Sequence, residues 1–170
     1  MKKVTLSLIV FCVFFASNCL RAQSTLPEVG TAEDGPWYYI QVKGSDAVRT
    51  NRVFAAIPDE TTGNVRVMGV GKDEINSIED VNRRLWSFED YGNGSYIIVN
   101  KQEENVLGIW NWAEKSKDIA IVETTLSTGW KLIPVEGQEE NGYFNMEATD
   151  PITSGSPYLH QGNDGWKFGL

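Results

Sequence analysis

The sequence predicts an all-β fold made of three imperfect copies of one unit, and three observations support this prediction. A strand-forming phrase that opens with an aromatic residue occurs three times, each time after a turn-rich cluster. A second phrase, centred on a tryptophan, is also present three times. No segment carries a sustained helical stripe of apolar residues. Such internal self-similarity is the signature of a fold built from repeated units.

The positions of the two phrases define the copies. The first phrase occupies residues 37–42, 96–100 and 143–146. Its tyrosines, Tyr39, Tyr96 and Tyr143, are 57 and then 47 residues apart. The second phrase occupies residues 85–88, 129–132 and 165–168, with the tryptophans Trp86, Trp130 and Trp166. Because aromatic side chains dominate core burial, we expect these three tryptophans to pack in the core.

Residues 1–22 are expected to be a secretory signal peptide. Lys2 and Lys3 precede an apolar run over residues 4–15, which is shorter than the roughly 20 residues of a membrane span. A cleavage site follows Ala22. Two alternatives stay open, an uncleaved N-terminal anchor and a lipid anchor at Cys19. The segment predicts a protein that is secreted, periplasmic or held at the cell surface.

Removal of this segment makes the chain more acidic and leaves it without cysteine. The formal net charge of −8 becomes −11, because the segment holds two lysines, one arginine and no acidic residue. Cys12 and Cys19 leave with it, so the core alone must hold the remaining 148 residues. Nucleic acid and anionic membrane surfaces attract lysine and arginine instead. We therefore expect no nucleic-acid binding, and no membrane insertion after cleavage.

A leader and a single domain follow the signal peptide. Residues 23–35 have few large apolar side chains and several turn formers, so they are expected to be an extended leader into a domain over residues 36–170. Strands are predicted at residues 37–42, 49–57, 64–70, 96–100, 106–112, 119–123, 130–135, 143–147, 158–161 and 166–168. Between the first and second copies, residues 72–84 form a polar insertion. The spacing of Ile75, Ile78 and Val81 there permits either one helical turn or a capped loop.

The third copy is short, and two interpretations are open. Residues 165–168 are either the closing strand, with one strand skipped, or the third strand, with the fourth missing. We favour the second interpretation. It predicts an open sheet edge that a partner could pair with, and a chain that is a truncated form of something longer.

Three four-stranded units around one core describe a β-trefoil. The pattern Tyr-Ile-x-x-x-Lys, a later Leu-Trp-x-Phe, and Pro-Tyr-Leu-His-Gln-Gly at residues 157–162 resemble the ricin-type β-trefoil lectin-like domains, in particular divergent ones in exported proteins of Bacteroidetes-type bacteria. The resemblance covers residues 36–170. It implies a six-stranded barrel capped by hairpins, which binds carbohydrate in a shallow pocket on one or more lobes.

The chain departs from this family at one motif. The lectin subfamily carries Gln-x-Trp in each unit, where the glutamine helps to form the pocket. Here Trp86 follows Arg84-Leu85 and Trp130 follows Thr128-Gly129, and the residues before Trp166 contain no glutamine in that place either. Sugar binding is therefore an expectation from the fold, and a fold does not imply a function.

One candidate ligand-binding group comprises Trp110, Asn111 and Trp112. The two tryptophans are two residues apart on a predicted strand, so they share a face. If that face is exposed, two indole rings can stack on a sugar ring. If it is the core face, both rings are packing residues.

A second candidate group comprises Tyr158, His160, Gln161 and Asn163, which combine an aromatic ring with hydrogen-bonding groups in one short stretch. The alternative for His160 is a hydrogen-bonded packing role, since the resembling family repeats Tyr-Leu-His as a structural phrase.

No catalytic apparatus is visible in the sequence. His160 is the only histidine, and no cysteine remains after cleavage to act as a nucleophile or a zinc ligand. The adjacent carboxylates at residues 103–104 and 139–140 lie in predicted turns, which gives no reason to expect the facing geometry of a glycosidase. We expect a non-enzymatic protein without a cofactor or a metal, which binds a glycan or another extracellular ligand.

Two other functions stay open. One is a protein-binding or protease-inhibitor-like trefoil that presents a protruding loop at residues 57–63 or 72–84. The other is a structural module of a longer exported protein.

Overall fold

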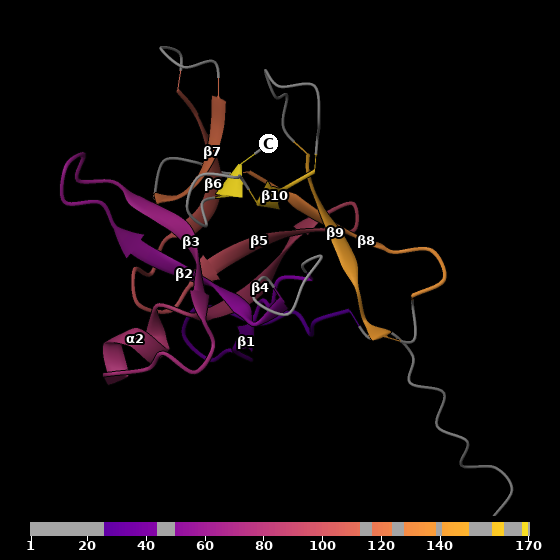
Figure 1. Cartoon of the computed structure of the whole chain (residues 1–170). Helices are drawn as coiled ribbons and strands as arrows, with labels where there is room; N and C mark the ends of the chain where they lie inside the picture. The colour runs from indigo at the N-terminus through magenta and orange to yellow at the C-terminus, as the bar shows by residue number, and fades with distance from the viewer. Residues whose placement is uncertain are drawn as a thin grey trace, which may run out of the picture.

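The computed structural model describes residues 26–43, 50–112, 117–123, 128–138, 141–149, 158–161 and 168–169. Within these ranges eleven strands join in one curled sheet that resembles half of a barrel (Figure 1). The all-β prediction is confirmed.

The strands fall into three units in chain order. The first unit contains β1 (Tyr38–Tyr39), β2 (Arg52–Pro58), β3 (Val65–Gly71), the helix α2 (Ile78–Asn82) and β4 (Leu85–Gly92). The second contains β5 (Ser95–Asn100), β6 (Val106–Trp112), β7 (Lys117–Glu123) and β8 (Trp130–Pro134). The third contains β9 (Phe144–Ala148), β10 (His160–Gln161) and β11 (Phe168–Gly169).

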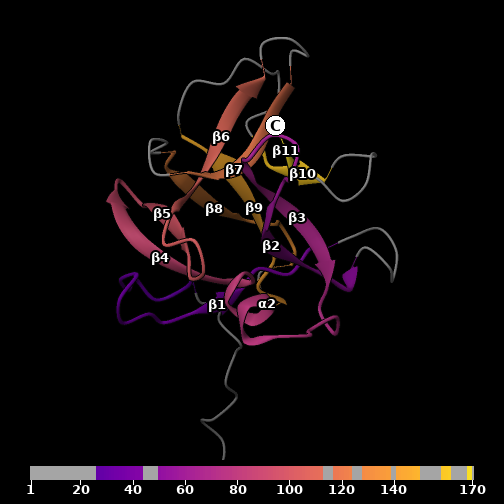
Figure 2. The same ribbon diagram turned by 90° about the vertical axis from the view of Figure 1, so that its left-hand side faces the viewer.

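The strands have two roles that repeat from unit to unit. The wall of the half-barrel runs β1–β4–β5–β8–β9, because β4 pairs with β1 and β5, and β8 pairs with β5 and β9. The remaining strands form the hairpins β2–β3, β6–β7 and β10–β11. These hairpins are joined by pairing of β3 with β7 and of β7 with β11. Figure 2 shows the β6–β7 hairpin rising above the wall strands β8 and β9.

The tryptophans of the second phrase lie where the sequence predicts. Trp86 and Trp130 are fully buried, and each pairs with the first wall strand of its unit, at Tyr38 and Tyr96. The indole N–H of Trp86 donates to the carbonyl of Phe54 at 3.2 Å. That of Trp130 donates to the carbonyl of Leu107 at 2.9 Å. Trp166 lies outside the described residues.

The alignment of the three opening tyrosines needs a correction by one residue in two copies. The equivalent positions are Tyr38, Tyr96 and Phe144, as the pairing of β4 and β8 with their neighbours shows. Tyr39 is 51% exposed, whereas the ring of Tyr38 contacts Phe88 edge to face at 5.7 Å. Two adjacent aromatic residues satisfy the same phrase, so the sequence alone did not show which one faces the core.

The insertion between β3 and β4 contains the short helix α2, in agreement with the helical alternative. Ser77 caps it, because its hydroxyl accepts a hydrogen bond from the backbone N–H of Asp80. Arg83 then bonds to Glu79 within the insertion and to Glu103 after β5, both at 2.6 Å. These contacts hold the helix against the barrel.

Arg84 closes the base of the same insertion. Its guanidinium group is buried and donates to the backbone carbonyls of Gly71, Lys72 and Glu74. A buried cation needs such partners. The two ends of the insertion are therefore joined by one side chain.

The position of β11 distinguishes between the two interpretations of the short third copy. β11 pairs with β10 and β7, just as β7 pairs with β6 and β3, so it is a third strand and not a closing strand. No described residue occupies the wall position between β9 and β1 that would correspond to β4 and β8. Among the described residues, this agrees with the second interpretation.

Candidate functional site

The two candidate groups belong to one continuous part of the sheet. β6, β7, β11 and β10 are neighbours in that order. β6 pairs with β7 over the whole of Val106–Trp112, and β11 joins β7 to β10. This stretch of sheet, β6–β7–β11–β10, is called the candidate surface below.

The first group lies at the end of β6. Asn111 pairs with Asp118, and the tryptophans on either side pair with Ile119 and Lys117 across the hairpin. Earlier on the same strand, Leu107 is fully buried and Ile109 packs against the core. Trp110 and Trp112 occupy the positions that alternate with these two core residues.

The second group lies on and beside β10. Tyr158 forms an isolated bridge with Glu147 of β9 and is 42% exposed. Leu159 packs against the core, and its N–H donates to the carbonyl of Met146 at 2.9 Å. His160 and Gln161 form β10 itself. Asn163 lies outside the described residues.

One row of paired residues connects the two groups. Trp110 pairs with Ile119, Ile119 with Gly169, and Gly169 with His160. Neighbouring strands are about 4.8 Å apart, so the three steps of this row span about 14 Å. The structure therefore brings Trp110 and His160, which are 50 residues apart in sequence, onto one row of the same sheet.

A charged pair that the sequence analysis did not single out lies on the adjacent hairpin. The Nε of Arg66 is 2.8 Å from the Oδ2 of Asp59, and Arg66 pairs with Ile121 of β7. The other carboxylate oxygen of Asp59 accepts hydrogen bonds from the N–H groups of Thr61 and Thr62. The sequence did contain a signal for this turn, because an aspartate commonly accepts hydrogen bonds from the backbone N–H groups two and three residues later.

This environment lowers the pKa of Asp59. Burial acts to raise the pKa, but the two backbone hydrogen bonds and the positive charge of Arg66 together outweigh it, so the pKa lies below its ordinary value of 3.8. Asp59 is thus negatively charged at neutral pH. It joins the β2–β3 turn, through Thr61 and Thr62, to Arg66 on β3.

The described residues contain no group of three or more His, Cys, Asp or Glu side chains that could hold a metal ion. In the same ranges, no helix is both long enough and apolar enough to span a bilayer.

Comparisons with known proteins identify the fold. No protein-family model matches the chain, and a search of curated proteins finds no match. Among solved structures, the chain is similar to the crystal structure of a designed threefold-symmetric protein, ThreeFoil, with a TM-score of 0.51 and 18% identity. The similarity covers 78% of this chain and 86% of that one. Together with the three units described above, it shows that the chain has a β-trefoil fold.

Proposed function

We propose that this protein is an exported, non-enzymatic carbohydrate-binding protein and that its sugar site lies on the candidate surface. The single observation that carries the proposal is the alternation of β6. Leu107 and Ile109 contact the core, while Trp110 and Trp112 occupy the alternate positions. Successive residues of a strand alternate between its two faces, so residues 110 and 112 take the strand positions opposite to those of the core residues Leu107 and Ile109.

The chemistry of this pair suits a sugar. A pyranose ring presents apolar C–H groups on its faces and hydroxyl groups around its edge. Flat aromatic rings stack on the faces, and amide side chains both donate to and accept from the hydroxyls. Asn111 and Gln161 supply such amides on the first and last strands of the candidate surface.

The position of β6 also supports the proposal. Its last residues belong to a hairpin that projects from the body of the molecule (Figure 1). A ligand can reach a projecting hairpin without any rearrangement of the barrel. A shallow surface of this kind favours reversible, weak binding that several lobes or copies would strengthen.

The direct test is a glycan-array screen of residues 23–170, which include every described element. The Trp110→Ala/Trp112→Ala double variant is screened beside it, and circular dichroism and thermal unfolding check that it is folded. Ile78→Ala is the matched control, because it also removes an exposed apolar side chain, 76% exposed, but from the insertion. We expect the double variant to lose at least tenfold in affinity and the control to bind normally.

Two results would count against the proposal at different levels. Binding that survives in the folded double variant would keep the carbohydrate function and move the site, and a Tyr158→Ala/His160→Ala variant would then test the second group. Absence of binding to any glycan by well-folded protein would contradict the function itself.

Protein binding is the second candidate function, and the exposed face of the insertion favours it. Ile78 lies on α2 and Ile75 just before it, and both are exposed. Arg83 holds this helix rigidly against the barrel through Glu79 and Glu103. Exposed apolar side chains on a rigid protrusion are suited to a protein partner. Loss of partner binding in Ile78→Asp, with glycan binding unchanged, would support this second function.

A further inference from the structure

The wall of the half-barrel has one position without a described strand. β4 lies between β1 and β5, and β8 lies between β5 and β9. The same relation would place a strand between β9 and β1, beside Phe144 at the start of β9. Further along that edge of β9, Glu147 bridges Tyr158 and the carbonyl of Met146 accepts from Leu159, just as Val99 of β5 pairs with Val106. The described pairing of residues 38–42 lies on their opposite edge. The position bounded by residues 38–42 and by β9 (Phe144–Ala148) is called the seam below.

Two cation–π contacts show that the seam is held open by the width of a strand. Lys101, just after β5, lies over the ring of Trp37, just before β1, at 5.1 Å, and β4 runs between those two strands. Lys43 lies over the ring of Tyr143 at 5.0 Å. Lys43 and Tyr143 occupy the equivalent positions on the two sides of the seam. The lysine–ring contact across β4 and the one across the seam therefore have nearly the same length, so the seam is about as wide as the position that β4 fills.

The direction of the backbone hydrogen bonds shows which edge of residues 38–42 faces the seam: the edge away from β2. The carbonyl of Ile40 accepts from Phe54, and the N–H of Val42 donates to Arg52, so both bonds are directed to β2. In an antiparallel ladder the intervening residue directs its own N–H and carbonyl to the opposite side. Gln41 therefore presents its backbone groups to the seam.

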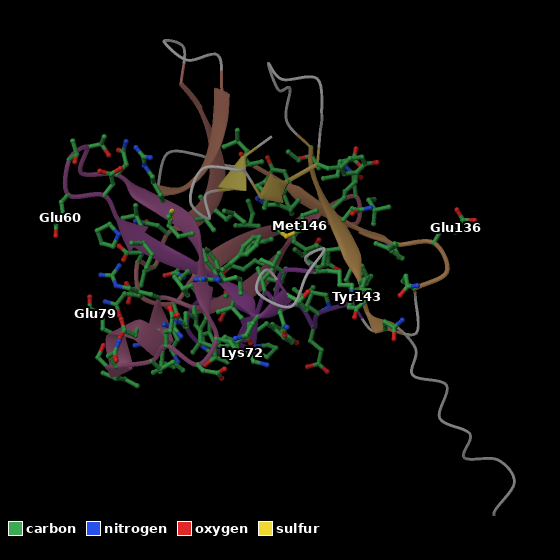
Figure 3. All side chains as sticks on the ribbon, in the orientation of Figure 1. Glu60, Lys72, Glu79, Glu136, Tyr143 and Met146 are labelled. Carbon is green, nitrogen blue, oxygen red and sulfur yellow. The ribbon has the colours of Figure 1, made fainter. Side chains whose placement is uncertain are left out.

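Apolar side chains beside the seam are less covered than their equivalents. Ile98 on β5 is fully buried, whereas the equivalent Ile40 is only half-buried. Met146 of β9 points into the barrel from the other side (Figure 3). Met146 is already buried, so a strand in the seam would mainly cover the exposed part of Ile40.

The two occupied wall positions indicate what such a strand must carry. Both β4 and β8 place a fully buried tryptophan opposite the first wall strand of the unit, and a large apolar residue, Phe88 or Leu132, two positions later. The carbonyls that accept the two indole N–H groups belong to Phe54 and Leu107. The equivalent residue of the third unit is Leu159, which follows from its bond to Met146.

We propose that the seam is a strand-acceptor site, which binds an extended segment of a separate polypeptide that contains Trp-x-Phe or Trp-x-Leu. The tryptophan lies between Phe144 and Val42, and the later apolar residue lies opposite Ile40. Backbone bonds to the open edge give affinity, and the indole pocket gives specificity.

A second copy of the chain is a less suitable donor. Its β4 and β8 already belong to its own wall. The third copy of the phrase, residues 165–168, ends at Phe168, which pairs with Gln161 in the hairpin β10–β11. To donate any of these segments, the second copy would have to give up its own pairing.

The test uses the chain of residues 23–170 and a fluorescent peptide with the sequence of residues 128–135, Thr-Gly-Trp-Lys-Leu-Ile-Pro-Val. We expect saturable binding with one peptide per chain. The matched control is the same peptide with Trp130→Ala, which should bind at least tenfold more weakly. Absence of saturable binding, or equal binding of the two peptides, would overturn the proposal.

Disulfide trapping places the peptide in the seam. The predicted register puts position 131 of the peptide opposite Gln41, so a Gln41→Cys chain should form a disulfide with a Lys131→Cys peptide, since residues paired across strands are close enough to be bridged. Glu60→Cys is the matched control, because Glu60 is exposed on the β2–β3 turn, on the opposite side of the molecule from β9 (Figure 3). Equal trapping at both positions would overturn the assignment to the seam.

A third outcome would identify a different occupant. Disulfide-linked dimers of Gln41→Cys in the absence of peptide, without such dimers for Glu60→Cys, would assign the seam to a second copy and overturn the separate partner. None of these readouts depends on glycan binding, so the outcome is distinguishable from that of the proposed function.

Discussion

The strands β5 and β1 occupy equivalent places in the barrel, but their surroundings differ. β5 has β4 on one edge and β6 and β8 on the other, whereas the described neighbours of residues 38–42 all lie on one edge. Tyr96 and Ile98 of β5 are buried, whereas the equivalent Tyr38 and Ile40 are half-buried. The residue types are the same. Burial at these positions is therefore determined by the number of neighbouring strands and not by the local sequence.

The largest expected effect is a difference between two identical substitutions. Ile98→Ala removes a fully buried side chain and is expected to cost about 2–5 kcal/mol of unfolding free energy. Ile40→Ala should cost about 1 kcal/mol, because part of that side chain already contacts water in the folded state. Urea unfolding followed by tryptophan fluorescence measures both. Equal losses would show that the two strands are equally enclosed.

The second comparison concerns the two lysine contacts. Lys101→Met and Lys43→Met keep the aliphatic length but remove the charge over the rings of Trp37 and Tyr143, and each is expected to cost about 0.5–1 kcal/mol. Lys101→Met should cost slightly more, because tryptophan is the better cation–π partner. The same urea titration measures them. A neutral Lys43→Met would indicate that the seam is not held at a fixed width.

The smallest effect is expected far from the seam, at Asp59, and it depends on pH. Asn in this place keeps an oxygen that accepts from Thr61 and Thr62 but loses the ion pair with Arg66. Because the pKa of Asp59 is lowered on folding, its charge stabilises the fold above pH 3.8, and this contribution is lost as the pH falls through the folded-state pKa.

The stability difference between the parent chain and Asp59→Asn should therefore be constant near neutral pH and shrink below pH 3.8. Urea midpoints measured between pH 7 and pH 2.5 check this. The peptide of residues 128–135 should not change the difference, which makes Asp59→Asn a control for the seam. A difference that grows on acidification would contradict the assigned direction.

The repeated phrases predicted most of the fold because they report local alternation and burial. The prediction of a strand at residues 106–112 matches β6, and those at residues 64–70 and 130–135 match β3 and β8 to within one residue at each end. The first strand was predicted as residues 37–42, but only Tyr38–Tyr39 forms a regular strand, with a single further bridge at Gln41. A phrase shows that a segment can be extended; the neighbouring strands determine how far the ladder runs.

Non-local pairing explains what the sequence did not determine. Residues 129–132 and 165–168 carry nearly the same phrase, yet the first contributes Trp130 to a wall strand while Phe168 of the second lies in a hairpin strand. Only the pairing of Gly169 with Ile119 and His160 distinguishes the two roles. The same pairing places Trp110 and His160 on one row, a relation that no spacing within a single segment predicts.

The closed base of the insertion between β3 and β4 has a consequence for protein engineering. The guanidinium group of Arg84 fixes both ends of residues 71–84, so the barrel does not depend on what lies at the tip. Each doubling of the length of a flexible loop costs only about 0.6 kcal/mol in closure entropy. Foreign segments grafted between residues 75 and 79 would meet a preformed stem, so this loop could serve as a display site on a small scaffold whose described residues contain no cysteine.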